Sequence, residues 1–337
     1  MLFLNIARCL FGICVPIFIV LSGYLLAKRE FNKNHICKLG RIVIVYILCS
    51  IVCLLVLHFI ENRDVLRLKD YIFQILSFEA APYSWYVNMY FGLFLLLPFL
   101  NVLWNNLKNK KQKQYLLLVL IVIAVLPNTL NIFNFYDLNW WLEPTSSHVY
   151  QKLVPDYWGG ISYIILYYFL GCYFRDYRLK LSFKKNVVAL LVALVIFGLF
   201  NYYRSYNALF ELGSYSDYGS LEVWVVTILF VNLILNFKFK ISNKKAIYFI
   251  SKISYLTFGA YLVSVIFDRW FYPILKENTS ILLERVCYLL LVVPLIFICS
   301  LLLSLVIEVI AYLVNKLFRG TLTFIGRKRR HEISFEE

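Results

Sequence analysis

The side chains best suited to contact a substrate in this sequence are polar and aromatic groups near the ends of long apolar runs. Polar groups are costly where a chain crosses a membrane, so those that occur there are candidates for a functional role. Arg41 opens one apolar run, where its guanidinium would either extend to the membrane surface or bind an anionic cytosolic ligand. Asp268 closes another run, next to Arg269. The full set of candidates is Ser22, Tyr24, Arg41, Trp85, Tyr86, Asn88, Tyr261 and Asp268.

Most of these candidates also have a purely structural explanation. In Ser22-Gly23-Tyr24, the glycine would let a second helix backbone approach, and the two hydroxyls would hydrogen-bond across helices. Trp85 and Tyr86 open a run at the position where aromatic side chains anchor a helix at the membrane interface. Asp268 and Arg269 would pair with each other. The sequence leaves both explanations open.

Motifs of soluble enzymes, metal sites and bound cofactors do not occur in the sequence. It has no GxSxG, no GxGxxG, no P-loop and no HExxH. The eight cysteines form no CxxC pair, and Cys49 and Cys53 share a helix face where packing explains them. The four histidines are His35, His58, His148 and His331. None lies in the middle of an apolar run, so the catalytic residue stays unknown, and we expect neither a metal nor a bound cofactor.

The composition indicates a membrane protein. Of the 337 residues, 61% are hydrophobic and only 16% are charged, whereas soluble domains are about 45–50% apolar. Runs such as YLLLVLIVIAVL (115–126) do not alternate in polarity, which argues against a β-barrel. We therefore expect an all-α, polytopic bundle of membrane helices.

Nine apolar runs are candidate transmembrane helices. They cover 9–27, 41–60, 85–103, 115–135, 160–175, 186–203, 220–237, 246–267 and 281–315. The loops after the first, third, fifth, seventh and ninth runs are basic, and the others are mixed or acidic. Basic loops mark the cytoplasmic side, so the pattern predicts a cytoplasmic C-terminus and an external N-terminus. The net charge of +15 follows from this topology, and we expect no nucleic-acid partner.

The chain reads as one membrane domain followed by a tail. Residues 1–318 hold all the apolar runs, and residues 319–337 form a basic, polar cytoplasmic segment. We expect residues 330–337 to be disordered, as polar chain ends often are.

Four stretches give the sequence a resemblance to a known family. They are VPIFIVLSGYLLAKR (15–29), GRIVIVYIL (40–48), SWYVNMYFGLFLLLPFLN (84–101) and ISKISYLTFGAYLVSVIFD (250–268). In their order and predicted topology they resemble the acyltransferase 3 family, the multi-pass O-acyltransferases that modify bacterial surface polysaccharides. Two further stretches, 161–176 and 218–230, give weaker support.

The resemblance implies a function and a departure from the family pattern. It implies acyl-CoA, usually acetyl-CoA, as donor, a sugar hydroxyl of an envelope glycan or its lipid-linked precursor as acceptor, and the bacterial cytoplasmic membrane as location. It also implies ten helices, the first of which bears an Arg and a catalytic His. Here the run that resembles the second helix comes first, and Arg8 has no histidine in the same run. We expect the family's first helix to be missing from this sequence, through a misplaced start or a truncation, and the chain as given to be inactive.

Two other functions stay open from the sequence alone. A glycan flippase or transporter would be expected to show repeated halves and charges at mid-bilayer, and no convincing repeat is visible. A glycan polymerase would be expected to carry a large external loop with Arg and His. The external segment 136–160 leans acidic, and Lys152 is its only Lys or Arg.

Overall fold

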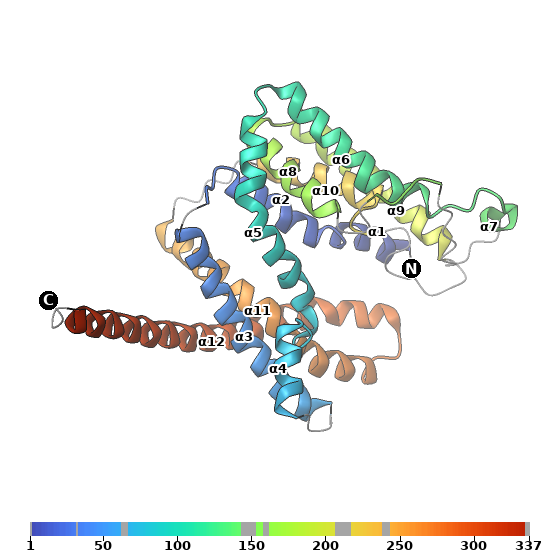
Figure 1. The fold of residues 1–337 in the computed structure, drawn as a ribbon. Helices are drawn as coiled ribbons and strands as arrows, with labels where there is room; N and C mark the ends of the chain where they lie inside the picture. Colours follow the sequence, from blue (N-terminus) through green and yellow to red (C-terminus); the bar gives the residue numbers. More distant parts are fainter. Residues whose placement is uncertain are drawn as a thin grey trace. The chain divides into compact units, whose positions relative to one another are not determined.

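Helices make up the architecture. The computed structural model describes residues 2–31, 33–61, 67–142, 153–157, 162–205, 217–237 and 243–333, and these ranges contain no strand (Figure 1). This confirms the predicted all-α class. In the hydrocarbon layer no water can bond the backbone, so the backbone must form its own hydrogen bonds. The chain is therefore helical even where β-branched residues and prolines would make a poor helix in water.

Seven helices within the described ranges are long and apolar enough to cross a membrane. All nine predicted runs overlap helices, but two of those helices are short: α8 (Ser162–Asp176) and α10 (Leu221–Asn236). The first span begins at Leu2, earlier than predicted, and consists of α1 (Leu2–Phe11) and α2 (Cys14–Leu26). Pro16 explains the break between them, because it has no N–H to donate to the carbonyl of Gly12.

The chain forms two compact units. Unit 1 comprises residues 1–31 and 93–240, and unit 2 comprises residues 32–92 and 241–337. Helix α5 (Trp85–Asn106) contributes its first turns to unit 2 and the rest to unit 1. Each unit therefore combines segments that are far apart in the sequence.

Unit 1 is built from α1, α2, α8, α10 and most of α5, together with three further helices. These are α6 (Lys110–Leu130), α7 (Leu138–Leu142) and α9 (Phe183–Arg204). Helix α2 packs against α8, α1 packs against α9 and α10, and α6 packs against α8 and α10. The Ser220 side chain caps α10 by accepting a hydrogen bond from the Val223 amide.

Two glycines bring α2 and α8 into backbone contact. A Cβ atom on Gly23 would lie 2.0 Å from the carbonyl oxygen of Tyr168, and one on Gly171 would lie 2.0 Å from that of Val20. The Cys172 thiol reaches the carbonyl oxygen of Gly23 across the same contact, at 3.6 Å. The close approach predicted at Gly23 is therefore confirmed, and it is reciprocal.

Replacing Gly23 by alanine should separate the two helices, because the obstructing atom is a backbone carbonyl that no rotamer change can move. We expect Gly23→Ala to lower the free energy of unfolding by about 2 kcal/mol, within the range for overpacked sites. Thermal unfolding of the purified protein in detergent would measure the loss. Gly40→Ala is the matched control, since a Cβ there meets nothing within 4 Å; equal losses in both variants would contradict the packing explanation.

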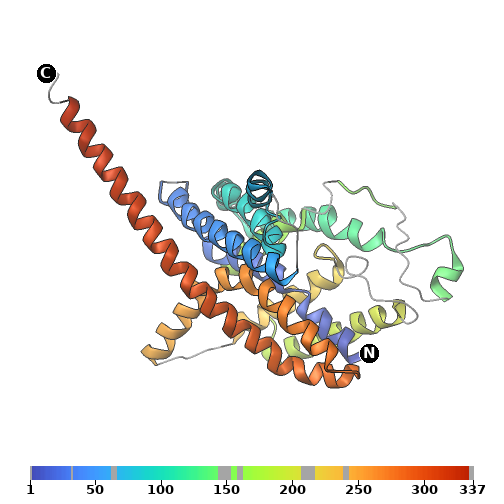
Figure 2. The same cartoon turned by 90° about the horizontal axis from the view of Figure 1, so that it is seen from below.

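Unit 2 consists of three long helices, two short elements and the start of α5. The long helices are α3 (Lys33–Ile60), α11 (Lys244–Glu277) and α12 (Leu282–Ile333), and the short elements are α4 (Leu68–Leu76) and the 3₁₀ turn η1 (Pro82–Ser84). Helix α11 packs against both α3 and α12. The predicted disorder from residue 330 is wrong for residues 330–333, because α12 continues to Ile333 (Figure 2). Lys and Arg are good helix formers and extend a helix already nucleated; residues 334–337 lie outside the described ranges.

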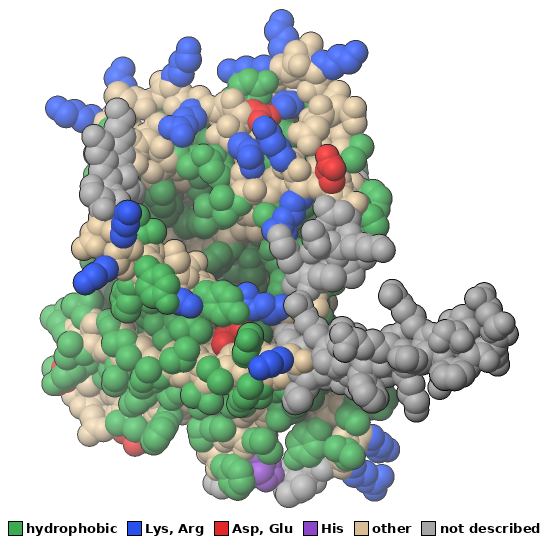
Figure 3. Space-filling model, turned by 90° about the vertical axis from the view of Figure 1, so that its left-hand side faces the viewer, with side chains coloured by type: hydrophobic (Ala, Val, Ile, Leu, Met, Phe, Trp, Pro, Cys, Tyr) green, Lys and Arg blue, Asp and Glu red, His purple; other side chains and the backbone are tan. Residues whose placement is uncertain are grey.

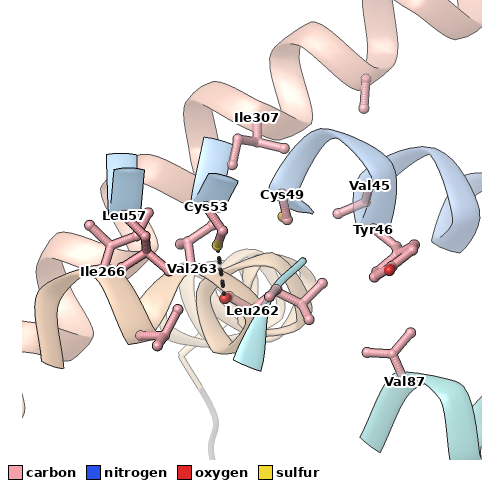
Figure 4. Close-up of a cluster of buried hydrophobic side chains, with 13 residues drawn as sticks. Val45, Tyr46, Cys49, Cys53, Leu57, Val87, Leu262, Val263, Ile266 and Ile307 are labelled. Carbon is pink, nitrogen blue, oxygen red and sulfur yellow. Dashed lines mark hydrogen bonds between the residues drawn. The ribbon is translucent and has the colours of Figure 1, made fainter. Parts of the chain in front are cut away.

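The core of unit 2 lies where α3, α11 and α12 meet. Cys49 and Cys53 are fully buried there, as their predicted packing role requires, and the Cys53 thiol lies 3.5 Å from the carbonyl oxygen of Leu262 (Figure 4). Leu57, Ile266 and Ile307 surround them. This apolar contact holds the three long helices in register and so determines which side chains meet at each of their ends.

Much of the molecular surface is apolar. Large hydrophobic side chains such as Phe18, Leu95 and Leu290 are more than half exposed, and Figure 3 shows wide hydrophobic areas with Lys and Arg side chains gathered at its upper edge. A soluble protein rarely exposes patches of this extent. The described surface is therefore that of a membrane protein.

Candidate functional site

Arg41 on α3 is held at one end of unit 2 by residues from two other helices. Its Nη2 atom donates to the Glu308 carboxylate on α12 at 2.6 Å, and its Cζ atom lies 3.5 Å above the centre of the Tyr255 ring on α11. Glu308 is only 7% exposed at its side chain, whereas that of Arg41 is 41% exposed. The pair therefore has a buried anion and an accessible cation.

The accessible side of Arg41 can bind an anion. A guanidinium has five N–H donors in a rigid fork that matches phosphate oxygens. Within the described part of the chain, Glu308 is the hydrogen-bond partner recorded for this side chain. The sequence analysis named neither Glu308 nor Tyr255 as a site residue. Their contact with Arg41 depends on helix packing, which spacing along the sequence does not reveal.

A second cluster lies at the other end of the long helices and begins with a tight turn after α4. Phe78 has φ 63°, a left-handed conformation that few non-glycine residues adopt. Its ring stacks on Tyr46, with centroids 4.6 Å apart. The buried Ser84 hydroxyl lies within bonding distance of the carbonyl oxygens of Phe78 and Ala81. These contacts fix the turn and so position the residue between them, Tyr83.

Tyr83 connects the turn to α11. Its hydroxyl donates to Asp268 Oδ2 at 2.7 Å, and its ring stacks on Tyr261, with centroids 5.8 Å apart. Tyr86 meets Tyr261 edge-on at 5.9 Å, and Trp85 meets Tyr86 in the same manner at 6.2 Å. Four of the predicted site residues, namely Trp85, Tyr86, Tyr261 and Asp268, are thus brought into one cluster.

A hollow with a volume of about 780 Å³ opens beside this cluster. Its lining includes Tyr83, Asp268, Arg269 and Tyr272. Arg269 Nε lies 3.5 Å from the Glu61 carboxylate, while Asp268 accepts from Tyr83. The direct ion pair expected between Asp268 and Arg269 is therefore not observed, because each side chain contacts a different residue. The sequence analysis missed Tyr83 because this residue precedes the apolar run that begins at Trp85. Its position two residues before Trp85 is the one feature of the sequence that could have indicated a role.

The other three predicted residues lie outside both clusters. Ser22 belongs to unit 1, and its hydroxyl donates to the carbonyl of Phe18 within its own helix at 2.9 Å. The hydrogen bond predicted for Ser22 across helices is therefore not the one observed. Tyr24, also in unit 1, accepts a hydrogen bond from Arg175 at its backbone carbonyl. Asn88 is exposed on α5.

Unit 1 holds a buried polar cluster of its own. Asn201 on α9 donates to Glu222 Oε2 on α10 at 2.8 Å and lies 3.6 Å from the Cys9 sulfur on α1. All three residues are at most 3% exposed. This cluster joins the three helices of unit 1 that the apolar contacts also bring together.

Removing the amide of Asn201 should destabilise unit 1, because the buried Glu222 carboxylate would lose its hydrogen bond. We expect Asn201→Ala to cost about 1–3 kcal/mol, the penalty for a buried polar group without its partner. Thermal unfolding in detergent would measure it. Asn106→Ala is the control, since that exposed amide bonds only within its own helix, to Val102. If Asn106→Ala were equally destabilising, the loss could not be assigned to Glu222.

The described ranges offer no site for a metal ion. No group of three or more His, Cys, Asp and Glu residues suited to a metal ion occurs in them. His35 is buried and His58 is partly buried in α3. His148 lies outside the described residues, as does the side chain of His331.

Comparison with known proteins agrees with the architecture. The sequence model of the acyltransferase 3 family, described as an acyltransferase domain, matches residues 2–313. The chain therefore belongs to the acyltransferase 3 family. That membership and the apolar helices define the class of the protein as a membrane acyltransferase. No curated protein and no solved structure matches the chain.

Proposed function

We propose that the protein transfers an acyl group, with acetyl as the first candidate, from acyl-CoA to a sugar hydroxyl. The acceptor is an envelope polysaccharide or its lipid-linked precursor, and the enzyme works in the bacterial cytoplasmic membrane. The family match over residues 2–313 supports the acyl-transfer class. The observation that carries the donor assignment is the accessible guanidinium of Arg41, held between Glu308 and Tyr255.

The chemistry at Arg41 suits the phosphates of coenzyme A. Arginine binds phosphate oxygens through parallel N–H donors, and such charge-assisted bonds are about twice as strong as neutral ones. The basic loops predict that this end of α3 faces the cytoplasm, where acyl-CoA is made. Glu308 and Tyr255 preorganise the side chain, so less rotamer entropy is lost when a phosphate binds.

The reaction itself needs no bound cofactor. The sugar hydroxyl oxygen forms a bond to the acyl carbon, the carbon–sulfur bond of the thioester breaks, and the hydroxyl proton ends on the thiolate of coenzyme A.

The direct test is transfer of labelled acetyl from acetyl-CoA to polysaccharide or lipid-linked sugar in membranes that contain the protein. The assay is run on the chain as given and on the longest form that its reading frame encodes, because the family resemblance connects catalysis with a histidine on another helix. Labelled glycan above the level of protein-free membranes supports the proposal. Absence of transfer from both forms overturns it.

Replacing Arg41 should weaken donor binding. Because charged hydrogen bonds contribute about 1.5–3 kcal/mol, we expect Arg41→Gln to raise KM for acetyl-CoA roughly 10- to 100-fold, with a smaller effect for Arg41→Lys. Initial rates of the labelled transfer at varied acetyl-CoA would measure it.

Two controls isolate the role of Arg41. Lys252→Gln removes an exposed positive charge from α11, and should leave KM unchanged if the effect is specific. The double variant Arg41→Gln/Glu308→Gln avoids leaving a buried carboxylate without its partner and should show the same raised KM. A rise in KM for Lys252→Gln of the same size would point to general surface charge and reject the site.

A further inference from the structure

We propose that the hollow beside Tyr83 and Asp268 is a binding site for an uncharged sugar unit. In this assignment, Asp268 accepts hydrogen bonds from neighbouring sugar hydroxyls, and the tyrosine rings supply the apolar faces. The assignment rests on the proposed function, since the sugar would be part of the acceptor glycan. It goes further by naming the site and the charge class of the acceptor.

The size and lining of the hollow fit a sugar. Its volume of about 780 Å³ falls within the range of about 300–1,000 Å³ usual for small-molecule sites. Two of its lining residues, Tyr83 and Tyr272, are aromatic, and Tyr261 stacks directly behind Tyr83. Tyrosine offers an apolar ring face for the C–H face of a sugar and a hydroxyl for its polar edge.

Asp268 has the geometry of a fixed acceptor. Its Oδ2 atom is held by the Tyr83 hydroxyl at 2.7 Å. The described residues give no hydrogen-bond partner to its Oδ1 atom, and the side chain is only partly buried. An ionised carboxylate accepts hydrogen bonds and donates none, so its ligand must bring donors. Sugar hydroxyls are such donors.

The charges around the hollow exclude a strong preference for an anionic ligand. Two carboxylates, Asp268 and Glu277, face two cations, Arg269 and Lys276. Arg269 is also engaged by Glu61. Without surplus positive charge, a phosphate or uronate would gain little here, in contrast to the accessible cation at Arg41.

The location on α11 fits an acceptor that arrives from the side opposite the donor. Tyr255 and Asp268 are thirteen residues apart on one helix, which corresponds to about 20 Å at 1.5 Å per residue. The loop charges predict that the Arg41 end is cytoplasmic and the Asp268 end external. An envelope glycan would approach the external end.

Binding can be tested without any acyl transfer. The full chain is purified in detergent, and saturation-transfer NMR is recorded with a panel of methyl glycosides of neutral hexoses and 6-deoxyhexoses, with methyl glucuronide as the anionic comparison. We expect at least one neutral glycoside to bind, and Asp268→Asn to weaken it tenfold or more. Tyr83→Phe, which removes only a hydroxyl, should weaken it less. Asp70→Asn, the same change on α4, should leave it unchanged.

The outcomes separate this inference from the proposed function. Neutral glycoside binding that depends on Asp268 supports the site even if no acyl transfer is found. Absence of binding by every neutral glycoside, or binding unaffected by Asp268→Asn, overturns it even if transfer proceeds. Tighter binding of the glucuronide overturns the uncharged class. A phospholipid retained by the wild type and lost from Asp268→Asn in native mass spectrometry would instead identify a lipid headgroup as the occupant.

Discussion

The structure depends on one constraint, the absence of hydrogen-bonding solvent around the chain where it crosses the membrane. Each span must therefore be a helix, and each polar side chain inside the unit must find a partner on another helix or reach an end. The Asn201–Glu222 contact and the Arg41–Glu308 pair show the two results. The first is buried and joins helices, whereas the second leaves its cation accessible and can serve a ligand.

The same constraint separates the chemistry of unit 2 into two ends. An apolar core around Cys53 and Leu262 occupies the middle of α3, α11 and α12. The charged groups of the two clusters therefore lie at the two ends of these helices. One end carries a guanidinium on an aromatic ring, and the other carries a carboxylate among tyrosines. The proposed donor carries phosphates and the proposed acceptor carries hydroxyls, so the two would need different recognition groups, and we propose that each end of unit 2 supplies one kind.

The sequence predicted the elements better than the contacts between them. Hydrophobic runs identified the helices because membrane thickness imposes their length. The break at Gly12–Ile13 was missed, since proline is tolerated in many membrane helices and Pro16 alone did not indicate it. Asp268, Tyr261 and Tyr86 were named as separate candidates, and nothing in their spacing indicated that they belong to one cluster. Its actual partner Tyr83 depends on the left-handed turn at Phe78, and Glu308 reaches Arg41 across 267 positions of sequence. Spacing along a single chain cannot report such pairings.

The reciprocal glycines of α2 and α8 also bear on how this sequence can change over time. At most tight contacts, a larger residue on one helix can be accommodated by a smaller residue opposite. At Gly23 and Gly171 the opposing atoms are carbonyl oxygens, which every amino acid possesses. No substitution at Tyr168 or Val20 can therefore create room, and a search for second-site suppressors should find none at those two positions. A substitution at Gly23 or Gly171 can therefore not be compensated by a smaller side chain on the opposite helix. It would require the two helices to move apart.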